Sequence, residues 1–226
     1  MIRNVLFIVE GQTEGLANVF GKGIHNILRQ EFDFMRQKAI RHQTLRKNGK
    51  YDLLSDVGFD VSRHLDPPKK KRQKLQQQGS PIGDYVFILR DLDCEDEAAI
   101  HQAIFEQIDS RFHNRVEIHF AVQEIEAWMI AHPEGFCAVY PNAPHQLLDD
   151  IRKLVPVRES PETAIDCDPK PAVHLERMTT KNGLKYRKTI EGPQALKLVA
   201  PDIVATRCPH FQSFRDSLRQ KMAYFG

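Results

Sequence analysis

Residues 4–15 of the chain read NVLFIVEGQTEG. The apolar run at the start of this stretch is short and rich in β-branched and aromatic residues, and Gly11 follows directly after Glu10. It therefore predicts a buried β-strand that ends in a tight turn. After the turn, Thr13 is a candidate N-cap for a helix over about 14–30. The strand thus presents a carboxylate at its end, and the role of that carboxylate depends on what lies beside it.

Two further apolar runs end in acidic residues in the same way. YVFILRDLD at 85–93 predicts a strand that ends in Asp91 and Asp93, and VEIHFAVQE at 116–124 alternates apolar with polar residues as a strand does. A helical pattern follows over about 95–111, and another begins at IEAWMIAH. Strands that alternate with helices predict a parallel α/β sheet.

Composition divides the chain into an α/β core over 1–132 and a proline-rich remainder over 133–226. We expect the remainder to be a helical elaboration packed on the core. Its short helices are expected over about 145–155, 171–180, 192–199 and 209–224. Within the core, a weak pattern near 34–41 favours another strand. The segment 66–84 predicts a flexible basic loop, because its prolines, glutamines and lysines supply no apolar anchors.

The bulk composition limits the class of protein. The 226 residues include 41% hydrophobic residues and carry a formal net charge of +2, so any contact with nucleic acid has to come from local basic clusters. No apolar run reaches the roughly 20 residues that cross a bilayer, and we expect no membrane contact. The cysteines are far apart in the sequence and form no CxxC pair, which indicates a reduced, cytoplasmic chain with unpaired thiols. They are Cys94, Cys137, Cys167 and Cys208.

The three acidic strand ends predict a metal site. In parallel sheets, ligands bind beyond the carboxyl ends of the strands, so Glu10, Asp91 and Asp93 are expected on one edge, with Glu124 and Glu126 from the third strand. Clustered carboxylates do not all stay ionised without a counter-charge. An oxygen-only ligand set favours Mg²⁺ or Mn²⁺ over zinc. If the last two glutamates were both helical, they would point about 200° apart, so at most one would face the site.

Each acid also has an ordinary structural explanation. Glu10 can be a solvated loop acid, and Asp93 or Asp96 can cap the following helix. The two later glutamates can simply favour the start of a helix. The coincidence of three acidic strand ends favours the site. Trp128, in contrast, is expected in the core rather than as a platform for a nucleic-acid base.

At these residues the sequence resembles a known family. VEGQTE at 9–14 together with FILRDLD at 87–93 resembles the Toprim domain of topoisomerases, primases and the OLD-family nucleases (overcoming lysogenization defect). QEIEAWMIA at 123–131 and the segment 186–218 resemble a narrower group of small bacterial and archaeal Toprim-like proteins, domain of unknown function 4276. The likeness covers nearly the whole chain and implies a Toprim-like parallel sheet flanked by helices.

The resemblance also implies roles for particular residues. Glu10 matches the Toprim acid that serves metal binding or acid–base chemistry, and Asp91 and Asp93 match the metal-binding pair. Glu14 matches an additional acid of the OLD type. Lys188, in YRK, is the candidate for a lysine that assists in OLD nucleases, and an ordinary surface lysine is the alternative. The expected metal ligands are Glu10, Glu14, Asp91, Asp93 and Glu126.

Basic residues supply the expected contacts to nucleic acid. KKKRQK at 69–74 holds five basic residues in six and can track a phosphate backbone without reading sequence, although a solvated loop is the alternative. Arg90 precedes the acidic pair and lies on the opposite strand face, where it can neutralise the acids or reach a phosphate. The other expected contact residues are Lys69, Lys70, Lys71, Arg72 and Lys74.

These inferences favour a Mg²⁺-dependent nuclease or related phosphoryl-transfer enzyme acting on nucleic acid, with a defence or toxin-like effector as one setting. OLD-type Toprim domains work beside an ATPase, and this chain has no Walker A sequence, so the resemblance implies a separately encoded ATPase. The alternative is a non-catalytic nucleic-acid-binding or regulatory subunit of an ATPase-containing complex. A small-molecule phosphohydrolase is disfavoured, because Glu95 stands where haloacid-dehalogenase phosphatases usually carry threonine.

Overall fold

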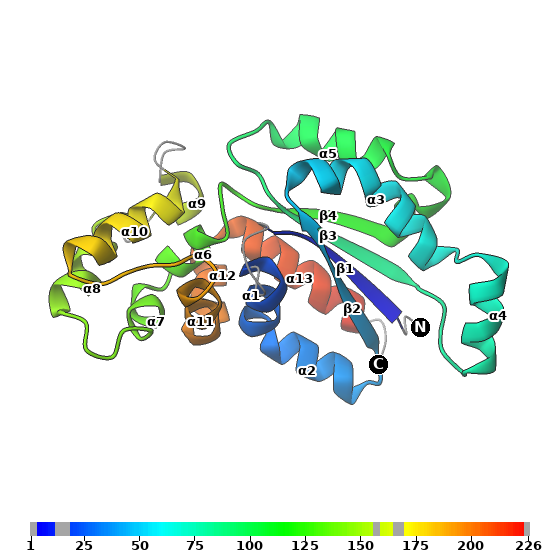
Figure 1. The fold of residues 1–226 in the computed structure, drawn as a ribbon, viewed down its shortest axis with the longest axis horizontal. Coiled ribbons are helices and arrows are strands. Elements are labelled where there is room, and N and C mark those ends of the chain that lie inside the picture. The colour runs from blue at the N-terminus through cyan, green and yellow to red at the C-terminus, as the bar shows by residue number, and fades with distance from the viewer. Residues whose placement is uncertain (1–3, 12–18, 156–158, 165–169, 224–226) are drawn as a thin grey trace.

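A four-stranded parallel sheet forms the centre of the structure, a computed structural model that describes residues 4–11, 19–155, 159–164 and 170–223 (Figure 1). The strands are β1 (Asn4–Gly11), β2 (Arg41–Asn48), β3 (Tyr85–Asp91) and β4 (Val116–Ala121). All pairings are parallel, and the order is β2-β1-β3-β4. The two central strands are the two most apolar runs of the sequence, because a central parallel strand is covered on both faces. The edge strand β2, RHQTLRKN, is polar.

Side chains alternate across the sheet, so each face has its own core. On β1, Leu6 and Ile8 pack into one core, and Val5, Phe7 and Val9 pack into the other. The first core is covered by α3 (Lys50–Leu65), α5 (Glu97–Glu106) and the 3₁₀ helix Ser110–Arg115. The second is covered by α1 (Val19–Ile27), α2 (Arg29–Gln37) and α13 (Pro209–Ala223). The result is a three-layered α/β/α arrangement (Figure 1).

The helical C-terminal part shares a core with the sheet. Phe214 of α13 meets Phe87 of β3 with ring centroids 6.2 Å apart. Several of these helices begin at a proline, where the missing N–H costs nothing. The remaining helices are α6 (Glu126–Ile130), α7 (Pro133–Cys137), α8 (His145–Arg152), α9 (Pro161–Ala164), α10 (Pro171–Lys181), α11 (Glu191–Leu198) and α12 (Pro201–Arg207).

Two predictions about local structure are wrong. The first half of the segment 34–41 belongs to the end of α2, where Phe32 and Met35 are buried at helical spacing, and the strand begins only at Arg41. The expected loop at 66–84 contains a helix, α4 (Lys69–Gln77). Lysine, arginine, glutamine and leucine all have high helix propensity, so α4 forms although none of its residues is buried.

The helix α3 had no counterpart in the sequence prediction. Its buried residues Leu53, Val57, Val61 and Leu65 recur every four positions and form one stripe against the sheet. That stripe was visible in the sequence. The helix α3 carries the chain from the carboxyl edge of the sheet back to the amino edge, because it connects the end of β2 to α4, which leads into the start of β3.

The cysteines differ from expectation at one position. Cys94, in the turn after β3, is disulfide-bonded, so the prediction of unpaired thiols is wrong there, whereas Cys137 and Cys208 are free. The prediction rested on the separation of the cysteines in the sequence. In a folded chain, residues far apart in sequence can lie close together, so this separation does not exclude a disulfide. Among the described residues, none of the helices combines the length and apolar composition that a bilayer crossing demands.

Candidate functional site

In the described part of the chain, six carboxylates whose charges act on one another lie at the carboxyl edge of the sheet, at the ends of β1, β3 and β4 and in the turns that follow. They are Glu10, Asp91, Asp93, Glu95, Glu124 and Glu126. Parallel pairing places the ends of β1 and β3 side by side, as the sequence predicts. Glu14, which the resemblance adds to this set, falls outside the described residues.

Glu10 and Arg90 form one half of the site. The register that pairs Val9 with Leu89 brings these two side chains next to each other on the face covered by α3 and α5. Arg90 Nε donates to Glu10 Oε2 at 3.2 Å, and its guanidinium also pairs with Glu95, which in turn meets Lys50 Nζ at 3.3 Å. Arg90 is fully buried. In this arrangement it therefore neutralises acids rather than presenting itself to a phosphate.

The Glu10 carboxyl titrates near neutrality. Burial raises its pKa from 4.5 to about 7, and the charges of Asp93 and Glu95 add to the rise, while Arg90 opposes it. The folded protein consequently holds this proton more tightly than the unfolded chain does. A carboxyl with such a pKa can accept or release a proton at physiological pH.

This shift predicts a pH-dependent effect of Glu10→Gln on stability. Wild-type stability should fall as pH rises from 4.5 to 7, because the folded state binds the proton that the unfolded state has already lost, and this contribution amounts to about 3 kcal/mol. Glutamine carries no such proton, so the variant should gain about that much relative to wild type between pH 4.5 and 8. Urea unfolding across this range measures the gain. Glu106→Gln on the exposed side of α5 is the control, and a Glu10→Gln difference that does not change with pH would contradict the assignment.

Lys188 is the cation of the other half of the site. Its Nζ lies 3.0 Å from Glu124 Oε1 and 3.3 Å from Glu126 Oε2. Tyr186 donates its hydroxyl to Glu126 Oε1 at 3.1 Å. Burial alone lowers the pKa of the lysine, but the surrounding carboxylates outweigh this and raise it. Lys188, for which the sequence left an ordinary surface lysine as the alternative, therefore lies at the centre of this group of carboxylates.

Both glutamates reach the lysine, although two helical residues at this spacing would diverge. The chain turns at Gln123, whose φ is 64°, and α6 begins only at Glu126. Glu124 therefore precedes the helix, and its second oxygen accepts the backbone N–H of Ala172 at 3.1 Å. The sequence argument that at most one of the two glutamates faces the site assumed that both are helical. Because Glu124 is not helical, both can face the site.

Asp91 lies beneath this group on the face of the sheet opposite Glu10. Its Oδ1 accepts the backbone N–H of Ile125 at 3.1 Å. Burial raises the Asp91 pKa well above its ordinary value, Lys188 opposes the rise, and Glu126, Glu124 and Glu10 reinforce it. The ionised form of Asp91 is therefore not fully compensated by the lysine.

Asp93 occupies the turn after β3, with a φ of 51°, and its carboxylate pairs with Lys170. Sequence reasoning missed Lys170, Lys50 and Tyr186, because each comes from a segment distant in sequence and carries no recognisable spacing. Asp96 is the residue that caps α5, through a 2.8 Å bond from the Ala99 N–H to its Oδ1. The capping alternative thus applies to Asp96 and not to Asp93.

The charge balance bears on metal binding. Among the described residues, five of the six carboxylates are ion-paired with four cationic side chains, Lys50, Arg90, Lys170 and Lys188, so full ionisation of the six leaves an excess of two negative charges. The all-oxygen donor chemistry fits Mg²⁺ or Mn²⁺. In the described part of the chain, no three histidine, cysteine or carboxylate side chains lie close enough to share an ion. The alternation of faces separates Glu10 from Asp91, and Asp93 is engaged by Lys170.

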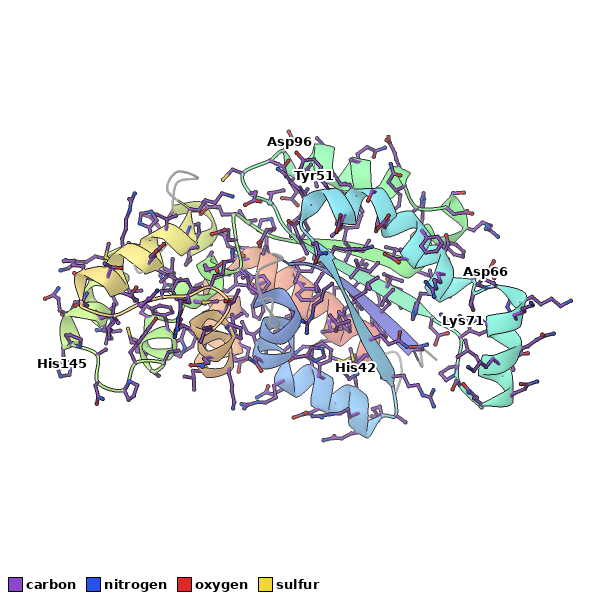
Figure 2. All side chains as sticks on the ribbon, in the orientation of Figure 1. His42, Tyr51, Asp66, Lys71, Asp96 and His145 are labelled. Atoms are coloured by element: carbon purple, nitrogen blue, oxygen red, sulfur yellow. The ribbon has the colours of Figure 1, made fainter. Side chains whose placement is uncertain are left out.

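The basic helix α4 lies at the opposite edge of the sheet. It follows the end of α3 and leads into the start of β3, whereas the carboxylates follow the strand ends. Figure 2 shows Lys71 on the α4 side of the molecule and Asp96, at the start of α5, away from it at the upper edge near the middle of the view. The seven residues of β3 separate these edges by roughly 20 Å. The basic run and the acids therefore do not act on the same phosphate.

Trp128 lies behind the site, within the core, as predicted. It is completely buried, its ring lies 4.7 Å from that of Phe211, and its Nε1 donates to Glu162 Oε1 at 3.2 Å. Burial of an indole is acceptable because its N–H finds this partner. It offers no surface on which a base could stack.

The fold and this charged edge define an α/β protein with a parallel sheet and a buried carboxylate–cation site at the strand ends. The model of the family described as domain of unknown function (DUF4276) matches residues 9–219. The chain belongs to that family. Comparison with curated proteins and with solved structures found no match.

Proposed function

We propose that the protein is a Mg²⁺-dependent phosphoryl-transfer enzyme that hydrolyses phosphodiester bonds in nucleic acid. The observation that carries the proposal is the excess of buried carboxylate charge at the carboxyl edge of a parallel sheet, where such folds bind ligands. Hard oxygen donors with uncompensated negative charge attract a divalent cation. The resemblance of VEGQTE and FILRDLD to the Toprim domain supports the same chemistry.

The residues take distinct roles in this proposal. Asp91 and Asp93 would hold the ion once Asp93 releases Lys170, with Glu14 or Glu126 completing the donor set, and bound Mg²⁺ would neutralise charge on a phosphate. Lys188 keeps the two glutamates beside Asp91 in place. Glu10, with its pKa of about 7, would hold or move a proton.

The central test is Asp91→Asn, which removes one buried charge and preserves side-chain size. Without metal, the variant should be more stable than wild type, because the ionised aspartate is poorly compensated. Wild type should gain about 2.7 kcal/mol at a Mg²⁺ concentration one hundred times the dissociation constant, and the variant should gain much less. Thermal melting with EDTA, Mg²⁺ or Mn²⁺ measures both effects. Cleavage of labelled DNA and RNA should fall in parallel.

Asp96→Asn is the matched control. It makes the same chemical change at the same edge, but Asp96 is an exposed helix cap and asparagine caps equally well. This variant should melt like wild type and keep the response to metal. A wild-type protein whose melting ignores millimolar Mg²⁺ and Mn²⁺, with Asp91→Asn no more stable in EDTA, would contradict the metal site.

A second candidate rests on the ion pairs themselves. Glu10, Asp93, Glu95, Glu124 and Glu126 each have a cationic partner in this arrangement. Such pairing favours a non-catalytic nucleic-acid-binding or regulatory subunit of an ATPase-containing complex. Absence of metal binding would select this candidate. A separately encoded ATPase and a defence or toxin-like setting rest on the likeness to OLD nucleases alone.

A further inference from the structure

The helix α4 is an isolated concentration of positive charge. Its nine residues include five cations and no acid, and none is buried. Figure 1 shows the helix at the far end of the molecule from α6 and α10, which border the carboxylates. An amphipathic membrane helix needs an apolar face, and α4 has only Leu75 to contribute to one.

The cations of α4 differ in their surroundings. At 100° per residue, Lys70, Lys71 and Lys74 fall within about 100° of one another, and Arg72 lies about 160° from Lys74. Arg72 is ion-paired with Asp66. We call the side of α4 that carries Lys70, Lys71 and Lys74 the lysine face. Lys71 lines a cavity beside this face, and Arg72 is not among the residues that line it.

This cavity, of about 280 Å³, lies between the edge strand β2 and the helices α3 and α4. Gln43 and Thr44 line it on β2, and Arg63 and His64 line it on α3. Burial lowers the His64 pKa to about 4, so the imidazole is neutral. The one acid in the lining, Asp60, is paired with Lys47. The cavity therefore has an uncompensated positive charge, which comes from Arg63 and Lys71, and polar side chains lie beside these two residues.

We propose that this cavity and the lysine face of α4 form a binding surface for the phosphate backbone of nucleic acid. One phosphate occupies the cavity between Arg63 and Lys71, and neighbouring phosphates contact Lys70 and Lys74. The last two lie roughly 6 Å apart along the α4 axis, which is on the order of twice the 3.4 Å of duplex axis that each phosphate of one DNA strand occupies. The surface is separate from the carboxylate edge, and binding there does not depend on the proposed chemistry.

The test measures binding of fluorescein-labelled 20-nucleotide DNA, RNA and duplex DNA by anisotropy, in EDTA, between 50 and 200 mM KCl. The variant Lys70→Gln/Lys71→Gln/Lys74→Gln should weaken binding at least about tenfold at the lowest salt and reduce the log–log salt slope by about 2–3. The single variant Lys71→Gln should reduce the slope by about 1. Thermal melting should show all variants folded, because the altered side chains are exposed.

Arg72→Gln is the matched control, since it removes the same charge from the same helix on the side paired with Asp66. It should leave the affinity within about twofold and the salt slope unchanged. The anisotropy assay contains EDTA and needs no bound metal, so failure of the metal site would leave this result intact. The proposal would be overturned if Arg72→Gln lost as much affinity for nucleic acid as Lys71→Gln, or if poly-glutamate bound as tightly as the nucleic-acid probes. Absence of binding to every probe at 50 mM KCl would overturn it as well.

Discussion

Lys188→Met should lower the free energy of unfolding by about 3–5 kcal/mol at pH 8, the usual cost of removing one partner from a buried ion pair. The substitution leaves Glu124, Glu126 and Asp91 without the ammonium group that lies among them. For a chain of this length, the melting temperature should fall by on the order of 10 °C. Urea unfolding in EDTA measures the free energy directly.

The pH dependence gives this prediction a second readout. The carboxylates raise the Lys188 pKa above its ordinary 10.5, so its stabilising contribution is fully present below that value and is lost only at higher pH. In the variant, the orphaned carboxylates can take up protons as pH falls. The deficit relative to wild type should therefore shrink between pH 8 and pH 5.

Lys185→Met provides the control for Lys188→Met. Lys185 is exposed in the same segment, so its replacement should change stability by less than about 0.5 kcal/mol. Adding Glu124→Gln to Lys188→Met should recover part of the loss, because one unpaired charge disappears. A Lys188→Met protein as stable as the Lys185→Met protein would show that the lysine does not hold the carboxylates together.

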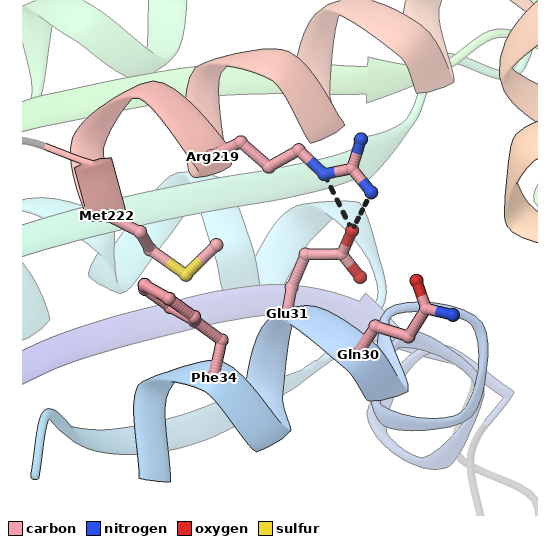
Figure 3. A pocket seen from close by; sticks show the side chains of 5 residues that line it. All are labelled: Gln30, Glu31, Phe34, Arg219 and Met222. Atoms are coloured by element: carbon pink, nitrogen blue, oxygen red, sulfur yellow. Dashed lines mark hydrogen bonds and ion pairs between the residues drawn. The ribbon is translucent and has the colours of Figure 1, made fainter. Parts of the chain in front are cut away.

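Arg215→Met should destabilise the protein by a similar amount, about 3–5 kcal/mol, at a site that contains none of the six carboxylates of the sheet edge. Arg215 of α13 is 2% exposed, and its Nε donates to Glu31 Oε1 of α2 at 2.8 Å. Its Nη1 also reaches Asp202 of α12 at 2.5 Å. Without it, Arg219 is the one ion-pair partner that the described residues leave to the buried Glu31, and it contacts the same oxygen from the rim of a small pocket (Figure 3).

Arg219→Met is the comparison, because this arginine pairs with the same carboxylate but its side chain is 46% exposed. Its loss should cost about 1 kcal/mol or less. The double variant Arg215→Met/Glu31→Gln should regain stability by removing the unpaired charge. Urea unfolding should show one transition, since α13 packs against the sheet itself. Two transitions, or equal costs for the two arginines, would contradict this account of the α2–α13 contact.

The sequence alone determined the three apolar strands with their acidic ends, the parallel α/β class and most helices of the C-terminal part. These features depend on local periodicity, which short-range sterics and burial impose. Local patterns also contained two helices that the prediction missed: the stripe from Leu53 to Leu65 in α3, and the run of helix formers in α4.

Only the tertiary structure decided how the charged groups are distributed. The register of β1 against β3 pairs Glu10 with Arg90 on one face and leaves Asp91 on the other, and a shift of one residue would reverse the faces. The C-terminal part of the chain brings Lys170 and Lys188 to the acids. The helix α3 places the basic helix α4 at the sheet edge opposite the acids. Such relations depend on packing between segments distant in sequence, so periodicity within either segment does not contain them.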